Sequence, residues 1–312
     1  MEDDGSTGAE AGIRGLDLGE EWKASHEALA FMSDIEPAEL LKCTFPDSLV
    51  TVSEGGRDLG RFTVTVEVAR RVQQPCMLLH AQSQGAINDS PCGTTVTAYL
   101  TTDLEVLEED YHEYVKLEGH SLDRRCHMVQ RDGQMLIDKV TTVGEETTTE
   151  SVSHPMSVLS GLVTEGSSLL LMRLIALRKT VPEHMTFISL DQGLRIIRTT
   201  FSELAPKQME VGDETVEVFG VERIVYSVED GPTTWQCYFL ADGHMASRVQ
   251  EELKADNALY LRQHPEIRAL MSDFLQFLLL RKPEDVFQFA REYFLPFASR
   301  RPPAPSLEAP PH

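Results

Sequence analysis

The sequence predicts an α+β fold in which a large antiparallel, half-barrel-like β-sheet wraps around one apolar helix, followed by a C-terminal pair of amphipathic helices. Three observations support this fold class. Between residues 48 and 251, apolar and polar side chains alternate in many short segments separated by turns, which is typical of an antiparallel meander. One segment near residues 156–179 is apolar on most of its helical faces. Residues 267–297 carry two successive stripes of apolar side chains at helical spacing.

The N-terminal segment precedes the β pattern. Residues 1–18 are small, acidic and glycine-rich, so a disordered acidic tail is expected there. A short helix is expected around Glu20–Met32. Pro37–Leu41 fits a single helical turn, because proline is well suited to the first helical position. The β-rich domain is assigned to residues 19–252.

Alternation identifies the first block of strands. Phe62, Val64, Val66 and Val68 alternate with polar residues, which is typical of a half-buried strand. The tetrapeptide Arg131-Asp-Gly-Gln134 is a two-residue hairpin signal. The other strands predicted in this block are Cys76–Gln82, Thr94–Thr101, Tyr111–Leu117, Arg125–Arg131 and Gln134–Val143.

One helix, predicted near residues 156–179, separates the first block from a second one. Its apolar residues cover most faces, so we expect it against the concave face of the sheet, although Gly161 and Gly166 weaken its first half. A binding element for a lipid or a partner is the competing interpretation. The second block of strands is predicted at Met185–Leu190, Leu194–Phe201, Glu214–Val228, Thr234–Ala241 and Met245–Glu251, with turn signals at Asp230-Gly231 and Asp242-Gly243.

Composition restricts the class of partner. The formal net charge of −22 argues against general binding of nucleic acid or of an anionic membrane. The longest apolar run, residues 167–177, is interrupted by Arg173 and is too short for a membrane helix, so no membrane insertion is expected. Five scattered cysteines without a C-x-x-C pair indicate a reducing compartment, and no secretory signal is visible in the acidic N-terminus.

The sequence contains no common catalytic or nucleotide-binding motif, so no enzyme activity and no cofactor are expected. His112, His120 and His127 lie near Cys126, but their spacing fits no common ligand pattern, and no metal is expected. The acidic cluster consists of Glu105, Glu108, Glu109 and Asp110. It is interpreted as a solvated face, with a docking surface for a basic partner as the alternative.

The two C-terminal helices leave apolar surface uncovered. Pro283 is expected to end the first helix and to begin the second, because it lacks an N–H and disfavours helix at the preceding residue. Phe277, Leu280 and Phe287 lie off the two stripes, so the pair cannot bury both stripes alone. Such a surface should recruit a partner, and a four-helix bundle of two copies is the simplest solution. The alternative is an ordinary helical hairpin packed on its own domain.

The stretch from Met271 to Phe294 closely resembles the dimerisation/docking module of the type II regulatory subunit of cAMP-dependent protein kinase. The Pro-x-Asp-x-x-x-Phe-Ala-x-x-Tyr-Phe signature is intact from Pro283 to Phe294. The resemblance implies a dimeric bundle that holds an amphipathic helix of an anchoring protein. The helical link and the docking helices are assigned to residues 253–299, and a proline-rich tail to residues 300–312. The implied dimerisation/docking residues are Ile267, Leu270, Met271, Phe274, Leu275, Leu278, Leu279, Pro283, Val286, Phe289, Ala290, Tyr293 and Phe294. Leu270, Phe274 and Leu278 would help to form the groove floor, and Phe289, Tyr293 and Phe294 would hold the bundle together.

The segment Trp235–Arg248 resembles the closing hairpin of half-barrel domains whose concave side sometimes holds lipid. The whole chain resembles the family of ciliogenesis-associated proteins that interact with a tetratricopeptide-repeat partner. This resemblance implies a non-enzymatic adaptor of the cytoplasm, cytoskeleton and cilium, linked to actin polymerisation. The nucleus and the plasma-membrane periphery are further implied locations. Other proteins with the docking module occur in axonemal complexes such as radial spokes, so the resemblance also implies an axonemal radial-spoke role. It further implies that the module forms a homodimer, or a heterodimer with a related module. A lipid or small-molecule carrier that uses the concave face of the sheet is the alternative hypothesis.

Overall fold

The computed structural model describes two compact units, residues 1–251 and 252–312. The described residues of the first are 22–52, 58–87, 90–117, 120–211, 214–227 and 231–250. Those of the second are 270, 273–274, 276–278, 280–283 and 286–298. The acidic tail predicted at 1–18, the start of the helical link at 253 and the proline-rich tail at 300–312 lie outside the described residues.

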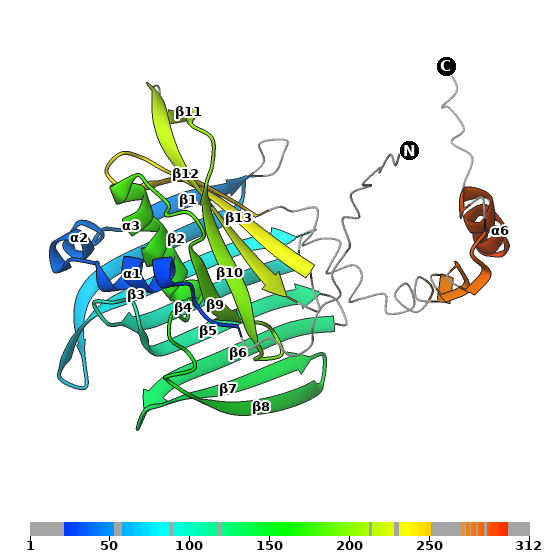
Figure 1. The fold of residues 1–312 in the computed structure, drawn as a ribbon, viewed down its shortest axis with the longest axis horizontal. Coiled ribbons are helices and arrows are strands. Elements are labelled where there is room, and N and C mark those ends of the chain that lie inside the picture. Colours follow the sequence, from blue (N-terminus) through cyan, green and yellow to red (C-terminus); the bar gives the residue numbers. More distant parts are fainter. Residues whose placement is uncertain are drawn as a thin grey trace, which may run out of the picture. The chain divides into compact units, whose positions relative to one another are not determined.

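The first block of strands forms one eight-stranded antiparallel sheet in which every strand pairs with its neighbour in sequence (Figure 1). Strand β2 buries Phe62, Val64 and Val66 on one face, as the alternation predicted. Asp132 and Gly133 both have positive φ, 49° and 74°, so the hairpin between β6 and β7 has the predicted left-handed turn. The strands are β1 Asp47–Val52, β2 Asp58–Arg71, β3 Gln74–Ile87, β4 Ser90–Leu100, β5 Val106–Leu117, β6 His120–Arg131, β7 Gln134–Val143 and β8 Glu146–Pro155.

The second block forms a separate six-stranded sheet of order β14-β13-β12-β10-β9, with β11 paired to β12. The described strands thus form two open antiparallel sheets, which confirms the α+β class with a large sheet. Five of the six strands were predicted. The strands are β9 Thr186–Leu190, β10 Ile196–Glu203, β11 Lys207–Val211, β12 Glu214–Ser227, β13 Gly231–Phe239 and β14 Met245–Gln250.

Helix α3 (Glu165–Arg178) lies between the two sheets and contacts β3 and β4 on one side and β12 and β13 on the other (Figure 1). All its residues from Gly166 to Ala176 are buried, as its apolar character predicted. The prediction of a start near residue 156 was wrong. Thr164 caps the helix through a reciprocal pair of hydrogen bonds with Ser167. The residues before Thr164 instead pair with β9, where the Val163 N–H donates to the Ile188 carbonyl (2.8 Å).

Two short helices cover one end of the unit. Helix α1 (His26–Ser33) begins after Ser25, whose hydroxyl accepts a hydrogen bond from the Ala28 N–H, and helix α2 (Pro37–Lys42) begins at proline as predicted. Strands β1, β8 and β11 were not predicted. Strand β8 is an edge strand with a mostly exposed Thr- and Ser-rich sequence, so it has no apolar alternation that would identify it.

Gly166 allows helix α3 to lie directly on the first sheet. A Cβ atom at this position would lie 2.6 Å from the Ala98 Cβ and 2.7 Å from Glu109 Oε2. Gly166→Ala is therefore expected to lower the free energy of unfolding by about 1–3 kcal/mol, the usual cost of overpacking, although alanine favours helix. Urea denaturation measures the effect. Gly193→Ala, in an exposed turn, is the control and should change stability by less than about 0.5 kcal/mol. A Gly166→Ala variant as stable as the wild type would contradict this interpretation.

Candidate functional site

The C-terminal unit contains a helical hairpin with an aromatic core. Its first helical segment ends at Arg281. The next residue, Lys282, has φ of 44° and donates its N–H to the Leu278 carbonyl (2.8 Å). This end, two residues before Pro283, confirms the predicted helix break. The second helix, α6, spans Val286–Ala298.

Phe274 is the centre of this hairpin. Its side chain is 8% exposed, and its ring centroid lies 6.0 Å from that of Phe289, 5.2 Å from Tyr293 and 5.1 Å from Phe294. The structure therefore brings four predicted site residues together. The sequence placed Phe274 on the floor of a docking groove, whereas in a single chain it packs within the hairpin.

Apolar side chains also remain on the outside of the hairpin. Phe277 is 51% exposed and Leu280 is 87% exposed, and Val286 is exposed as well. The off-stripe residues Phe277 and Leu280 are thus uncovered within the described part of this unit. Leu270, Leu278, Pro283 and Ala290 are partly buried, whereas the predicted site residues Ile267, Met271, Leu275 and Leu279 lie outside the described residues.

The acidic cluster does not form a single solvated face, so this prediction was wrong for Glu109. Successive side chains of a strand point to opposite faces, and Glu109 on β5 points inward with only 1% of its surface exposed. Its carboxyl group accepts hydrogen bonds from the Thr164 hydroxyl and from the Gly166 N–H (3.2 Å) at the start of helix α3. Burial raises the pKa of Glu109 from 4.5 to about 7. Strand alternation was the signal that could have identified this residue.

The outward-facing members of that region form ion pairs across strands. Glu108 pairs with Arg71, and Asp110 lies 2.7 Å from His127 Nδ1. Ligand atoms of Glu108, Asp110 and His127 lie within 4.8 Å of one another. Because Arg71 already supplies a positive charge to Glu108, this group is an ion-pair network rather than a cation site. His112 instead contacts Asp123 (2.8 Å), so the structure does not bring His112 and His127 to one ligand set.

A second buried charge lies in the middle of helix α3. Arg173 is 1% exposed and pairs with Asp47 of β1 through Nη2 (2.7 Å). Its Nη1 donates to the carbonyls of Cys43 (2.9 Å) and Phe45 (3.0 Å). Asp47 also accepts from the Met245 N–H (3.2 Å) of β14. The pair therefore connects the helix to an edge strand of each sheet.

Three of the five cysteines, Cys43, Cys126 and Cys237, are unsuited to nucleophilic chemistry at neutral pH. All three are free thiols. Burial raises the pKa of Cys43 to about 12 and that of Cys126 and Cys237 to about 11, so these three remain protonated.

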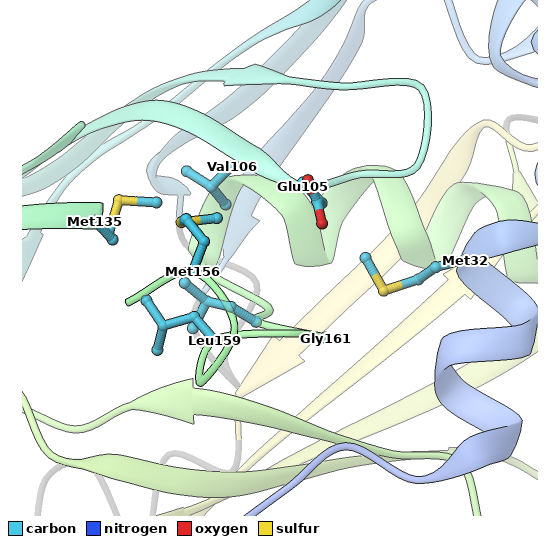
Figure 2. Close-up of a pocket in the computed structure, with 8 residues that line it drawn as sticks. Met32, Glu105, Val106, Met135, Met156, Leu159 and Gly161 are labelled. Atoms are coloured by element: carbon cyan, nitrogen blue, oxygen red, sulfur yellow. The ribbon is translucent and has the colours of Figure 1, made fainter. Parts of the chain in front are cut away.

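Two cavities lie beside helix α3. The smaller, of about 10 Å³, is lined by Met32, Met135, Met156 and neighbouring residues, and Figure 2 shows Met32 and Met135 reaching it from opposite sides. It has room for about one water molecule. The larger pocket, of about 290 Å³, lies between β2–β5 of the first sheet and β13–β14 of the second. The sequence suggested a ligand on the concave face only as an alternative, and the segment Trp235–Arg248, which carried that resemblance, supplies two residues of this lining.

These features define an acidic two-sheet α+β protein with an aromatic C-terminal helical hairpin. Residues 27–251 match the family model described as ciliogenesis-associated TTC17-interacting protein, N-terminal domain. Because this match covers more than half of the chain, the chain belongs to that family. Among the described residues, none of the helices has the length and hydropathy that a bilayer span requires.

Relatives of the same name align along nearly the whole chain. The protein named ciliogenesis-associated TTC17-interacting protein of Danio rerio is 43% identical, with 93% of this chain and 97% of the relative covered. The Xenopus laevis protein of the same name is 39% identical, with 92% of this chain and 90% of the relative covered. The Homo sapiens protein of that name is 31% identical, with 91% of this chain and 87% of the relative covered. No solved structure matches this chain.

Proposed function

We propose that this protein is a non-enzymatic adaptor that acts in cilium formation and binds the tetratricopeptide-repeat protein TTC17. The observation that carries the proposal is the 31–43% identity, along almost the full chain, to proteins named for ciliogenesis and for interaction with TTC17. Location at the cilium and the cytoskeleton follows from the same proposal. Links to actin polymerisation and to axonemal radial spokes stay predictions from resemblance.

The C-terminal hairpin is the proposed dimerisation and docking element of this adaptor. Its aromatic core holds the two helices together, and exposed Phe277 and Leu280 supply apolar surface for a second copy and for an amphipathic partner helix. An amphipathic helix binds such a surface through apolar residues at i, i+3, i+4 and i+7. A related module in another protein would offer the same surface, so the dimer is a homodimer or a heterodimer.

Leu278→Asp is expected to abolish dimerisation and partner-helix binding, because a carboxylate cannot be buried in an apolar interface without a partner charge. Light scattering coupled to size-exclusion chromatography measures the mass of the purified chain. The thermal unfolding of the β unit should not change, since Leu278 belongs to the other compact unit. Gln276→Asp is the matched control, because it places the same charge at an exposed position of the same helix and should leave the dimer intact.

The cellular experiment tests the adaptor role separately. Cells that lack the protein receive the wild-type chain, Leu278→Asp or Gln276→Asp, and the fraction of ciliated cells and the TTC17 that co-precipitates are measured. We expect the wild-type chain and Gln276→Asp to restore cilia and Leu278→Asp to fail. A wild-type chain that recovers no TTC17 would contradict the adaptor function. Full rescue by a monomeric Leu278→Asp chain would contradict the docking element alone.

A further inference from the structure

The larger pocket beside helix α3 has the composition of a binding site for a small amphiphile. Its apolar lining consists of Phe62, Ala81 and Val96 from the first sheet, Leu169 from helix α3 and Trp235 from the second sheet. Polar groups from both sheets also face it, among them the side chains of Thr94, Tyr111 and Arg248. Ligand pockets typically combine such an apolar lining with a few polar groups that fix orientation.

Arg248 on β14 is the unusual residue in this lining. Its guanidinium carbon lies 4.1 Å from the Trp235 ring centroid and 4.8 Å from that of Phe62, so rings from both sheets hold it. Among the described residues no carboxylate lies within ion-pair distance of Arg248, and its Nε has no hydrogen-bond partner. A guanidinium uses its flat faces for stacking and its edge for hydrogen bonds. Arg248 uses part of that edge for a hydrogen bond with the Cys237 thiol, and its Nε–H has no partner and remains for a ligand.

The other charges of the pocket are already balanced. Glu113 accepts from Arg124 (3.0 Å), and Glu165 accepts from the buried Arg223 (2.8 Å). Glu165 still has 35% of its side chain exposed, and it lines this pocket. Arg124 and Arg223 pair with these two carboxylates, so Arg248, whose charge acts on Glu165 at longer range, is the cation of the lining without a carboxylate in direct contact. One such cation matches a monoanion better than a phosphate dianion.

The pocket volume limits the size of the ligand. A volume of about 290 Å³ is at the lower end of the range of roughly 300–1,000 Å³ that is typical of small-molecule pockets. The pocket therefore suits a small ligand, such as octanoate, a carboxylate with a short saturated tail.

We propose that this pocket binds a monocarboxylate with a short apolar tail, with its carboxylate on the Arg248 guanidinium and its tail against Leu169, Ala81 and Val96. The proposal is independent of the adaptor role, because it concerns the β unit alone. The planar carboxylate accepts two parallel hydrogen bonds from a guanidinium edge, which a hydroxyl or an amine cannot do.

The test uses the full chain with Trp22→Phe, so that Trp235 in the pocket is the remaining tryptophan of the two in the sequence. Quenching of Trp235 fluorescence by 8-bromooctanoate, reversed by octanoate, is expected with a Kd of about 1 mM or lower. Octanol and octylamine have the same tail with a neutral or a cationic head, and they should compete at least about tenfold less well, since a charge-assisted hydrogen bond is lost.

Variants at Arg248 separate the charge from the packing. Arg248→Met retains an apolar stem between the two rings and should lower the affinity for octanoate about tenfold without changing the affinity for octanol. Arg248→Lys should retain much of the affinity for octanoate. Arg198→Met is the matched control, because Arg198 also stacks on an aromatic ring, that of Tyr226 (4.2 Å), outside this pocket. No saturable quenching at about 5 mM, or equal competition by octanol and octanoate, would overturn the proposal whatever the stability of the Arg248 variants.

Discussion

Replacing Arg173 with methionine is expected to lower the free energy of unfolding of the β unit by about 3–5 kcal/mol. The loss arises because Asp47, which is also buried, would lose the guanidinium that now lies 2.7 Å away and would keep only the half-exposed His244 Nδ1 (2.6 Å) and the Met245 N–H (3.2 Å) as partners. Two backbone carbonyls, those of Cys43 and Phe45, would lose their hydrogen-bond donor as well. Chemical denaturation followed by circular dichroism measures the change.

Two further variants identify the source of this loss. Arg178→Met removes another arginine of the same helix, but its pair with Glu39 is partly exposed, so a loss of about 1 kcal/mol or less is expected. Adding Asp47→Asn to Arg173→Met removes the buried negative charge, and the double variant should be more stable than the sum of the single effects predicts. An Arg173→Met variant that loses less than about 1 kcal/mol would show that the pair is not needed to hold helix α3 between the sheets.

The second large effect is a dependence of stability on pH that is centred on Glu109. Its pKa is raised by burial to about 7 in the folded protein from an ordinary value of 4.5. Between these two values the folded state binds more protons than the unfolded state, so stability falls as pH rises through this window. At about 1.4 kcal/mol per pKa unit, the loss approaches about 3 kcal/mol above pH 7.

Glu109→Gln should remove this dependence. The glutamine carbonyl can still accept from Thr164 and Gly166 but has no charge to bury. Relative to this variant, the wild-type protein is therefore expected to lose about 3 kcal/mol of stability between pH 4.5 and pH 8. Urea titrations at a series of pH values give both curves, and Asp110→Asn, at the exposed neighbouring position, is the control. Parallel curves for the wild type and Glu109→Gln would refute the assignment.

Local patterns predicted those elements whose burial repeats along the chain. Phe62, Val64 and Val66 identified β2 because one face of that strand is buried and the other is not. Strand β8 has almost no buried positions, so its place is decided by pairing with β7 and not by its own sequence. The apolar residues before Thr164 look helical, yet they form turns and pair with β9, a contact that no local pattern encodes.

The candidate sites divide in the same way. Helical spacing and Pro283 identified the C-terminal hairpin, and the rings of Phe274, Phe289 and Phe294 do meet. The contact of Arg248 with Phe62 joins residues that are far apart in sequence, so a ligand site on the concave face could be suggested but its lining could not be predicted.

By itself, therefore, the sequence determined which segments are strands with a buried face, that one helix is apolar all round, and where the last two helices separate. Only the tertiary structure decided that two sheets enclose the helix, that Glu109 and Arg173 are buried with their partners, and that Arg248 lines a pocket. The physical reason is the separation along the sequence of the residues that interact. Periodic burial is written in neighbouring residues, whereas ion pairs and cavities depend on segments that meet only when the chain is folded.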